Sequence, residues 1–199
     1  GMRTTIYRLP NIFGHSKTGK GPQHHIHLLS FIKGCLQLGI GPKTNDARYI
    51  LPVDIATKFI VLSSLKDEVN GKAINMVSER PILINTLFEW IIKRGFVVSL
   101  IPYPDWKRQA FLKMTDDNAL MEVYEAHFQE KFNNMRKISS PDYKVLNENF
   151  QELLTKLGME LPTYTQQLFT SYLNTLSTWL LEKHIDSEEA KYLDYQSYA

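Results

Sequence analysis

Residues 4–13, TTIYRLPNIF, and the loop that follows at 14–22, GHSKTGKGP, decide the fold class of this chain. The first segment is rich in β-branched and aromatic residues and runs directly into a glycine, which is typical of a buried strand that ends in a loop. A buried strand this close to the N-terminus needs neighbouring strands, so we expect other sequence to supply them. The loop holds three glycines, and loops behind buried strands often carry the ligand sites of α/β proteins.

Strands and helices alternate from this segment to about residue 103. Apolar residues at helical spacing predict helices over 23–38, from about 54, and over 85–94, while short β-rich runs predict strands over 48–51, 72–77 and 96–103. Asp54 is expected to cap the first turn of the second helix. This alternation predicts an α/β fold with a parallel sheet.

After Pro104 the strand signals end and only helices are predicted, over 105–114, 118–132, 143–157 and 162–183. Asp116 and Asp117 are interpreted as a helix cap. The last helix carries a stripe with a four-residue step, which we interpret as core packing; its members are Tyr164, Leu168, Tyr172, Leu176 and Leu180. The predicted division is 2–103 for the sheet portion, 104–185 for a helical lobe and 186–199 for a polar tail.

Composition excludes several classes of protein. The net charge of +2 over 199 residues, with no basic run, argues against a nucleic-acid partner. No apolar stretch approaches the roughly 18 residues of a membrane-spanning helix. The single cysteine, Cys35, allows no internal disulfide. We therefore expect a cytoplasmic location and no membrane partner.

The residues alone identify no reaction. The glycine loop matches neither G-x-G-x-x-G nor G-x-x-x-x-G-K-[ST]. His24 and His27 would share a helix face beside His25, but no third ligand is recognisable, so no metal site is predicted. Cys35 lies among apolar residues in a predicted helix, which indicates a buried, inert thiol.

Residues 8–19, RLPNIFGHSKTG, resemble the R-P-G-x-I-x-G-x-S-x-T-G segment of thioester reductase domains. These are extended short-chain dehydrogenase/reductases of nonribosomal peptide synthetases, polyketide synthases and carboxylic acid reductases. In the same register, 31–42 resembles their I-K-G-x-x-Q-L-G-x-x-P helix and 51–56 their P-V-D turn. The tryptophan-containing turn at 103–106, Asp117-Asn118-Ala119-Leu120 and the final P-x-x-x-x-L-F-x-x-Y-L helix also fit, so the resemblance covers about 5–181.

The resemblance implies the remnant of a Rossmann-like parallel sheet plus a mostly helical C-terminal substrate-binding lobe. Family members carry a G-x-x-G-x-x-G loop and a Tyr-x-x-x-Lys pair in an upstream half, and this chain has no such Rossmann segment. The spacing from Tyr103 to Lys107 is incidental, because it crosses a Pro-Asp-Trp turn. We therefore expect no catalytic residue in this chain, with NADP bound by the parent enzyme and not by this chain alone.

The resemblance also assigns two groups of residues to the loop region. The first group would edge the nicotinamide pocket: Pro10, Asn11, Ile12 and His15. The second group would line the substrate entrance: Ser16, Thr18 and Gly19.

By the same resemblance, the parent enzyme would release a carrier-bound acyl or peptidyl thioester as an aldehyde or alcohol. The expected partners are a phosphopantetheinyl carrier domain, which could meet Lys107 and Arg108, and the missing N-terminal Rossmann half. Self-association through an uncovered sheet edge is also expected. Two alternatives stay open: a non-catalytic module that docks an acyl carrier, and part of a fatty acyl-CoA reductase.

Overall fold

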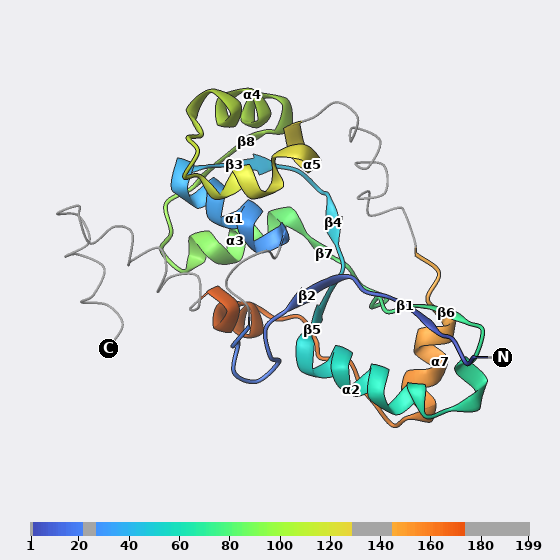
Figure 1. Cartoon of the computed structure of the whole chain (residues 1–199). Helices are drawn as coiled ribbons and strands as arrows, with labels where there is room; N and C mark the ends of the chain where they lie inside the picture. The colour runs from blue at the N-terminus through green and yellow to red at the C-terminus, as the bar shows by residue number, and fades with distance from the viewer. Residues whose placement is uncertain (1, 22–26, 129–144, 174–199) are drawn as a thin grey trace.

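The computed structural model describes residues 2–21, 27–128 and 145–173, in which helices and strands alternate (Figure 1). The α/β class is confirmed. The strands are β1 (Ile6–Arg8), β2 (Asn11–Phe13), β3 (Ile40–Lys43), β4 (Ala47–Arg48), β5 (Ile50–Pro52), β6 (Ala73–Asn75), β7 (Ile82–Leu83) and β8 (Ser99–Pro102). The α-helices are α1 (His27–Leu38), α2 (Val53–Ser64), α3 (Ile84–Lys93), α4 (Tyr103–Lys113), α5 (Tyr124–Phe128) and α7 (Glu148–Lys156), with 3-10 turns η1 (Asp67–Val69) and η2 (Ala119–Val123). Residues 166–173 form a further helical segment.

The strand predicted over 4–13 is split into β1 and β2 at Leu9 and Pro10, where the proline has no N–H to donate. β1 pairs in parallel with β6, and β2 pairs in parallel with β5. These neighbours come from later in the same chain. Ile6 is 54% exposed and Leu9 51% exposed, so β1 is not the buried strand that we expected. Tyr7, on the opposite face, packs edge-on against Phe59 of α2.

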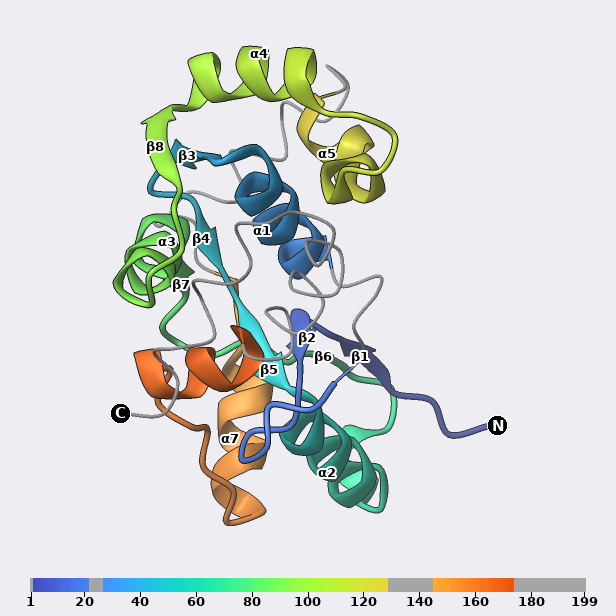
Figure 2. The same cartoon turned by 90° about the vertical axis from the view of Figure 1, so that its left-hand side faces the viewer.

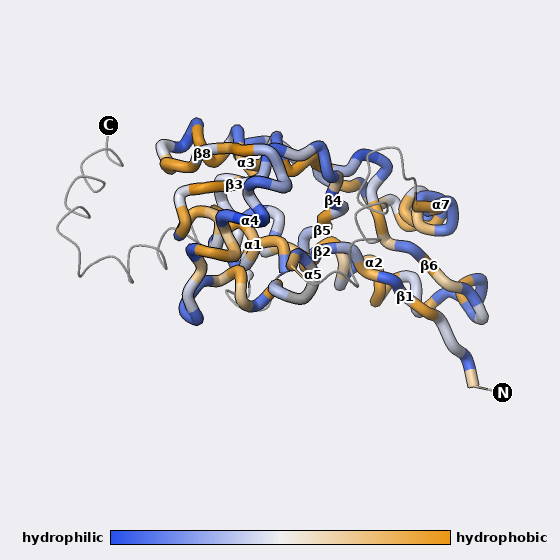
Figure 3. Tube along the Cα trace, turned by 90° about the horizontal axis from the view of Figure 1, so that it is seen from above, coloured by the Kyte–Doolittle hydropathy of each residue, from blue (hydrophilic) through white to orange (hydrophobic). Residues whose placement is uncertain are grey.

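Two clusters of buried apolar side chains form the core, one among α1, α3 and α4 and the other among α2 and α7 (Figures 1 and 2). At the β2–β5 pair they lie on opposite faces of the strands, because Phe13 and Ile50 belong to the first cluster and Leu51 to the second. The first cluster gathers α1, α3 and α4 around Phe31 and Trp106. The second gathers α2 and α7 around Phe59 and Phe150. In Figure 3, α7 shows both apolar and polar residues, as expected of a helix that is buried on one side.

The remaining strand pairs are short. β3 pairs in parallel with β8, and β4 pairs antiparallel with β7. The helix 166–173 lies near α3, because Phe169 contacts Trp90 with ring centroids 5.8 Å apart (Figure 2). Within the described residues, no helix is both long and apolar enough to cross a bilayer.

Several predicted helix ends are wrong. α7 begins at Glu148 and not at 143, and the last helix begins at residue 166 and not near Pro162. The cap expected from Asp116 and Asp117 is instead Asn118, whose side chain accepts a hydrogen bond from the Leu120 amide. The displaced cap has a local cause, because three consecutive polar residues, Asp116, Asp117 and Asn118, can each serve as a cap.

Candidate functional site

The candidate site lies where β2 and β5 end side by side. Phe13, the last residue of β2, is aligned with Pro52, the last residue of β5. The glycine loop 14–21 leaves β2, and α2 begins directly after β5. Both therefore start at the carboxyl edge of parallel strands, which is where open α/β sheets hold ligands.

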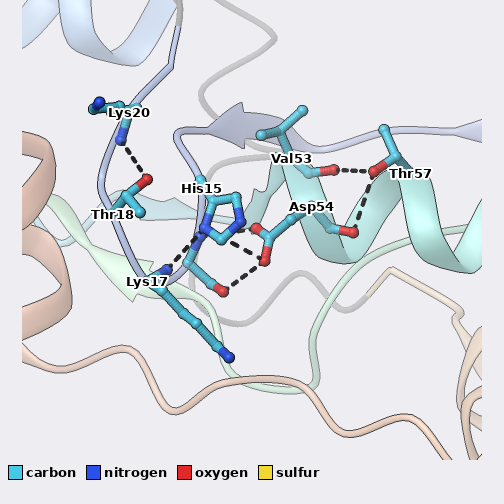
Figure 4. A network of polar contacts seen from close by, with 8 residues as sticks. His15, Lys17, Thr18, Lys20, Val53, Asp54 and Thr57 are labelled. Atoms are coloured by element: carbon cyan, nitrogen blue, oxygen red, sulfur yellow. Dashed lines mark hydrogen bonds and ion pairs between the residues drawn. The ribbon is translucent and has the colours of Figure 1, made fainter.

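Asp54 joins the two segments (Figure 4). Its carboxylate accepts two hydrogen bonds from Ser16, one from the backbone N–H at 2.8 Å and one from Oγ at 2.7 Å. The predicted capping role is wrong, since residue 52 occupies the cap position of α2 and the helix start has no side-chain cap bond. Asp54 lies inside the first turn, and its carboxylate reaches the loop instead.

The surroundings of Asp54 favour its charged form. Partial burial raises the pKa of this carboxyl, but the hydrogen bonds from Ser16 outweigh burial, and nearby His15 adds to them. The net result is a pKa below the ordinary value. Asp54 is therefore an anion that holds the loop at neutral pH.

His15 stands beside this anion with its side chain 41% exposed. Its Nδ1 lies 3.8 Å from an Asp54 oxygen and accepts a hydrogen bond from the Lys17 backbone N–H at 3.1 Å (Figure 4). Because a backbone N–H can only donate, Nδ1 is the acceptor in this contact, which leaves Nε2 as the ring nitrogen that can donate. His15 can thus offer an N–H donor beyond the loop.

The loop is closed by its own backbone. The Gly19 N–H donates to the His15 carbonyl at 2.9 Å, and the His15 N–H donates to the Lys20 carbonyl at 2.8 Å. A Cβ on Gly14 would lie 2.3 Å from the Gly19 carbonyl oxygen, and one on Gly19 would lie 2.4 Å from that of Ser171. These glycines therefore allow backbone to pack closely on backbone.

The residues assigned to the nicotinamide edge have different surroundings. The Asn11 side-chain amide donates to the Tyr49 carbonyl at 2.9 Å. Ile12 packs against the second core cluster, and Pro10 is half-buried. Of the four assigned residues, His15 is the one that can present a side-chain N–H, at Nε2, to a ligand.

The residues assigned to the substrate entrance share one loop but differ in exposure. Ser16 is held by Asp54, as described. Thr18 is exposed, and its Oγ1 accepts a 3.4 Å hydrogen bond from the Lys20 N–H. Gly19 is buried beneath Ser171.

Sequence reasoning missed the aromatic wall behind the loop. Tyr172 meets Phe13 edge-on with ring centroids 5.1 Å apart, and Phe169 stacks on Phe13 at 6.3 Å. Burial, and then the charge of Asp54, raise the pKa of the Tyr172 phenol above its usual range. The four-residue stripe indicated core packing, and Tyr172 is indeed only 2% exposed. The sequence did carry a signal for a polar contact here. The stripe contains two tyrosines, and a buried tyrosine hydroxyl needs a hydrogen-bond partner.

The described residues support neither a reactive cysteine nor a metal site. Cys35 is fully buried, which confirms the predicted buried thiol, and burial raises its pKa far above the usual range. No group of three potential metal ligands occurs among the residues that the structure describes. His24 and His25 lie outside those residues.

The comparisons with known proteins agree on the fold. No protein-family model matches the chain. The terminal reductase domain from the myxalamid PKS-NRPS pathway superimposes with a TM-score of 0.76 over 90% of this chain and 45% of that chain, at 21% identity. This chain therefore shares its fold with part of that reductase domain. A thiolation-reductase di-domain from an archaeal non-ribosomal peptide synthetase gives a TM-score of 0.73 over 90% of this chain and 37% of that chain, at 15% identity.

A curated relative leads in the same direction. The L-2-aminoadipate reductase large subunit of Eremothecium gossypii is 24% identical over 152 residues, which make up 75% of this chain and 11% of that protein. The chain therefore spans less than half of each solved reductase chain and about a tenth of this relative. The predicted resemblance to reductase domains and the Rossmann-like α/β fold are both confirmed.

Proposed function

We propose that this chain forms the substrate-binding side of an NAD(P)H-dependent thioester reductase, which releases a carrier-bound acyl or peptidyl thioester as an aldehyde or alcohol. One observation carries the proposal: in a fold shared with part of a reductase domain, the glycine loop is tied to Asp54 at the carboxyl edge of β2 and β5. Ligands of open α/β sheets bind at such an edge.

In this proposal His15 borders the nicotinamide, with the proton on Nε2 available to a ligand oxygen. Pro10 and Ile12 supply apolar surface beside it, and Asn11 fixes the backbone by its bond to Tyr49. Ser16 and Thr18 border the thioester arm, while Gly19 fixes the shape of the loop against Ser171. The chain itself supplies binding and orientation.

The glycine loop does not fit a cofactor pyrophosphate. A pyrophosphate needs space beside glycine Cα atoms and N–H groups that point toward it. Here backbone occupies the space beside Gly14 and Gly19, and the Gly19 N–H is bonded to the His15 carbonyl. NAD(P)H, when bound, would supply the hydride. We expect its pyrophosphate to be held outside this chain, with only the nicotinamide reaching the rim at His15.

The partner that we propose is a phosphopantetheinyl carrier domain. One of the similar solved structures is a thiolation-reductase di-domain, which supports a carrier as the partner. On α4, Lys107 is half-buried and Arg108 is exposed, and Arg108 bonds Asp105 at 3.1 Å. The positive charges of Lys107 and Arg108, the second of them paired with Asp105, would favour an acidic carrier through charge complementarity.

The proposal is tested by binding and by turnover. The 199-residue chain is titrated calorimetrically with S-hexanoyl phosphopantetheine and, separately, with NADPH. The longest natural protein that contains the chain is assayed for NADPH oxidation with the same thioester on a carrier domain. We expect the chain to bind the thioester and not NADPH, and the longer protein to turn over.

A matched pair of variants ties the result to the site. Asp54→Ala should weaken thioester binding because it releases Ser16, whereas Thr57→Ala, one turn later on α2 and exposed, should not. Thioester binding without turnover by the longer protein would favour the non-catalytic docking module. Absence of binding to the chain, together with absence of turnover, would refute the proposal.

A further inference from the structure

Two tyrosines at the helix 166–173 differ in how their hydroxyls are satisfied. Tyr164, just before the helix, donates a hydrogen bond to the carbonyl of Ile50 in β5. Tyr172, inside the helix, is only 2% exposed, and its hydroxyl has no hydrogen-bond partner in the described part of the chain. An unpartnered buried hydroxyl is destabilising, so its position calls for a physical reason.

The helix 166–173 contacts both ends of the glycine loop, through Tyr172 and Ser171. The Tyr172 ring packs against Phe13, the residue directly before the loop, at 5.1 Å. The neighbouring Ser171 presses its carbonyl against Gly19 near the far end of the loop. A small shift of this helix would therefore move the loop with it.

Asp54 lies close to Tyr172 in the fold, because the Tyr172 ring packs on Phe13 and Phe13 is aligned with Pro52, two residues before Asp54. Burial and then the Asp54 charge raise the pKa of the Tyr172 phenol, which therefore stays protonated and is a donor. Asp54 has capacity to accept, because two carboxylate oxygens offer about four lone-pair positions. Ser16 takes one position on each oxygen. His15 takes none through Nδ1, since that atom accepts from Lys17.

We propose that Tyr172 is a positioning residue of the site, whose hydroxyl donates a hydrogen bond to Asp54 when the loop closes on a thioester ligand. The bond couples the helix 166–173 to the loop 14–21 and holds Ser16 in place beside the ligand. This inference rests on the proposed function, because the ligand that closes the loop is the thioester arm.

The test uses the full 199-residue chain as wild type and as Tyr172→Phe, Tyr164→Phe and Asp54→Asn. The probe is S-hexanoyl phosphopantetheine, measured by calorimetry. Tyr172→Phe should bind the probe about tenfold more weakly, which is the effect of losing one hydrogen bond to a charged group. Its thermal midpoint without ligand should be no lower than that of the wild type, because the lost hydroxyl had no partner. Tyr164→Phe should show the reverse, a lower midpoint and unchanged probe affinity of the folded protein.

A second readout does not depend on the probe. With tyrosine labelled by ¹³C at Cζ, the Tyr172 resonance is assigned as the one missing from Tyr172→Phe, and its phenol is titrated with pH. Asp54→Asn should lower the pKa of that phenol, because it removes the neighbouring charge. An unchanged titration would overturn the inference whether or not the probe binds.

The outcomes separate the two proposals. Equal probe affinity of wild type and Tyr172→Phe would overturn the inference and leave the proposed function standing. A wild-type chain that fails to bind the probe would count against the proposed function. A loss of both affinity and thermal midpoint in Tyr172→Phe would mean that the hydroxyl is merely structural, which also overturns the inference.

Discussion

Two parallel strand pairs end in very different surroundings. Behind β2 and β5 lie the polar loop 14–21 and Asp54, bonded to each other through Ser16. Behind β8, which pairs with β3, α4 begins at once and buries Trp106 completely. Both edges have the topology that places ligand sites in α/β folds. The side chains that follow the strands decide which edge holds a site and which is filled by core packing.

The largest expected effect on stability comes from removing the Trp106 side chain, which fills the space behind β8. Trp106 contacts Phe31 and Tyr103 with ring centroids 5.5 Å apart in each case. Trp106→Ala should lower the free energy of unfolding by about 3–5 kcal/mol through the cavity that it leaves, as measured by urea denaturation. Thioester binding by the folded fraction should be unchanged. Lost binding at retained stability would place a site at this edge too.

A pair of glycines tests the close packing of the loop at the other edge. Gly19 and Gly39 have almost the same positive φ, +68° and +65°, but a Cβ meets Ser171 only at Gly19 and finds open space at Gly39. Gly39→Ala should cost about 1–2 kcal/mol for the left-handed backbone alone. Gly19→Ala should cost about 1–3 kcal/mol more because of the steric clash. Equal unfolding free energies for the two variants would show that Ser171 does not press on the loop.

The position of the glycine loop at the end of a strand was predictable from the sequence because that information is local. A β-rich segment, a glycine loop behind it and a helix after Pro52 were all recognisable from short stretches, and they put His15 and Ser16 at the carboxyl edge. The alternation of strands and helices was enough to predict parallel pairing, which holds for three of the four strand pairs in the described residues, whereas β4 and β7 pair antiparallel. The same local information includes Pro10, which lacks a backbone N–H and separates β1 from β2, although we predicted one continuous strand.

The sequence could not predict the contacts that hold the site together. Ser16 and Asp54 are 38 positions apart, and only the pairing of β2 with β5 brings them together. Tyr172 comes from the other end of the described chain, where its apolar ring fitted a core stripe. Local rules made Asp54 a cap, because a carboxylate in a first helical turn usually is one, and a tertiary contact took precedence.

Removing the Asp54 carboxylate should have a smaller effect on stability than Trp106→Ala. Asp54→Ala loses both bonds from Ser16, and because the Asp54 side chain is partly exposed, the two bonds together contribute about 1.5–3 kcal/mol. Thr57→Ala on the same helix removes a hydroxyl that bonds only the backbone of its own turn, so it should change the unfolding free energy by less than about 0.5 kcal/mol. Chemical denaturation of both variants measures the difference. Similar losses in the two would mean that Asp54 acts only within its helix.

The smallest expected effect is a pH dependence that belongs to the β2–β5 edge alone. The pKa of Asp54 is lower in the folded chain than its ordinary value, so the unfolded chain binds more protons as the pH falls past that value. The contribution of Asp54 to stability is therefore complete above the ordinary aspartate pKa of about 3.9, and it is lost as the pH falls through the lower, folded pKa. Urea midpoints of wild type and Asp54→Ala, measured from neutral to acidic pH, should converge in this range. At the β3–β8 edge, Trp106→Ala removes no titrating group, so its difference from wild type should stay constant with pH. Midpoints for wild type and Asp54→Ala that remained parallel would show that the carboxylate is not what holds the loop.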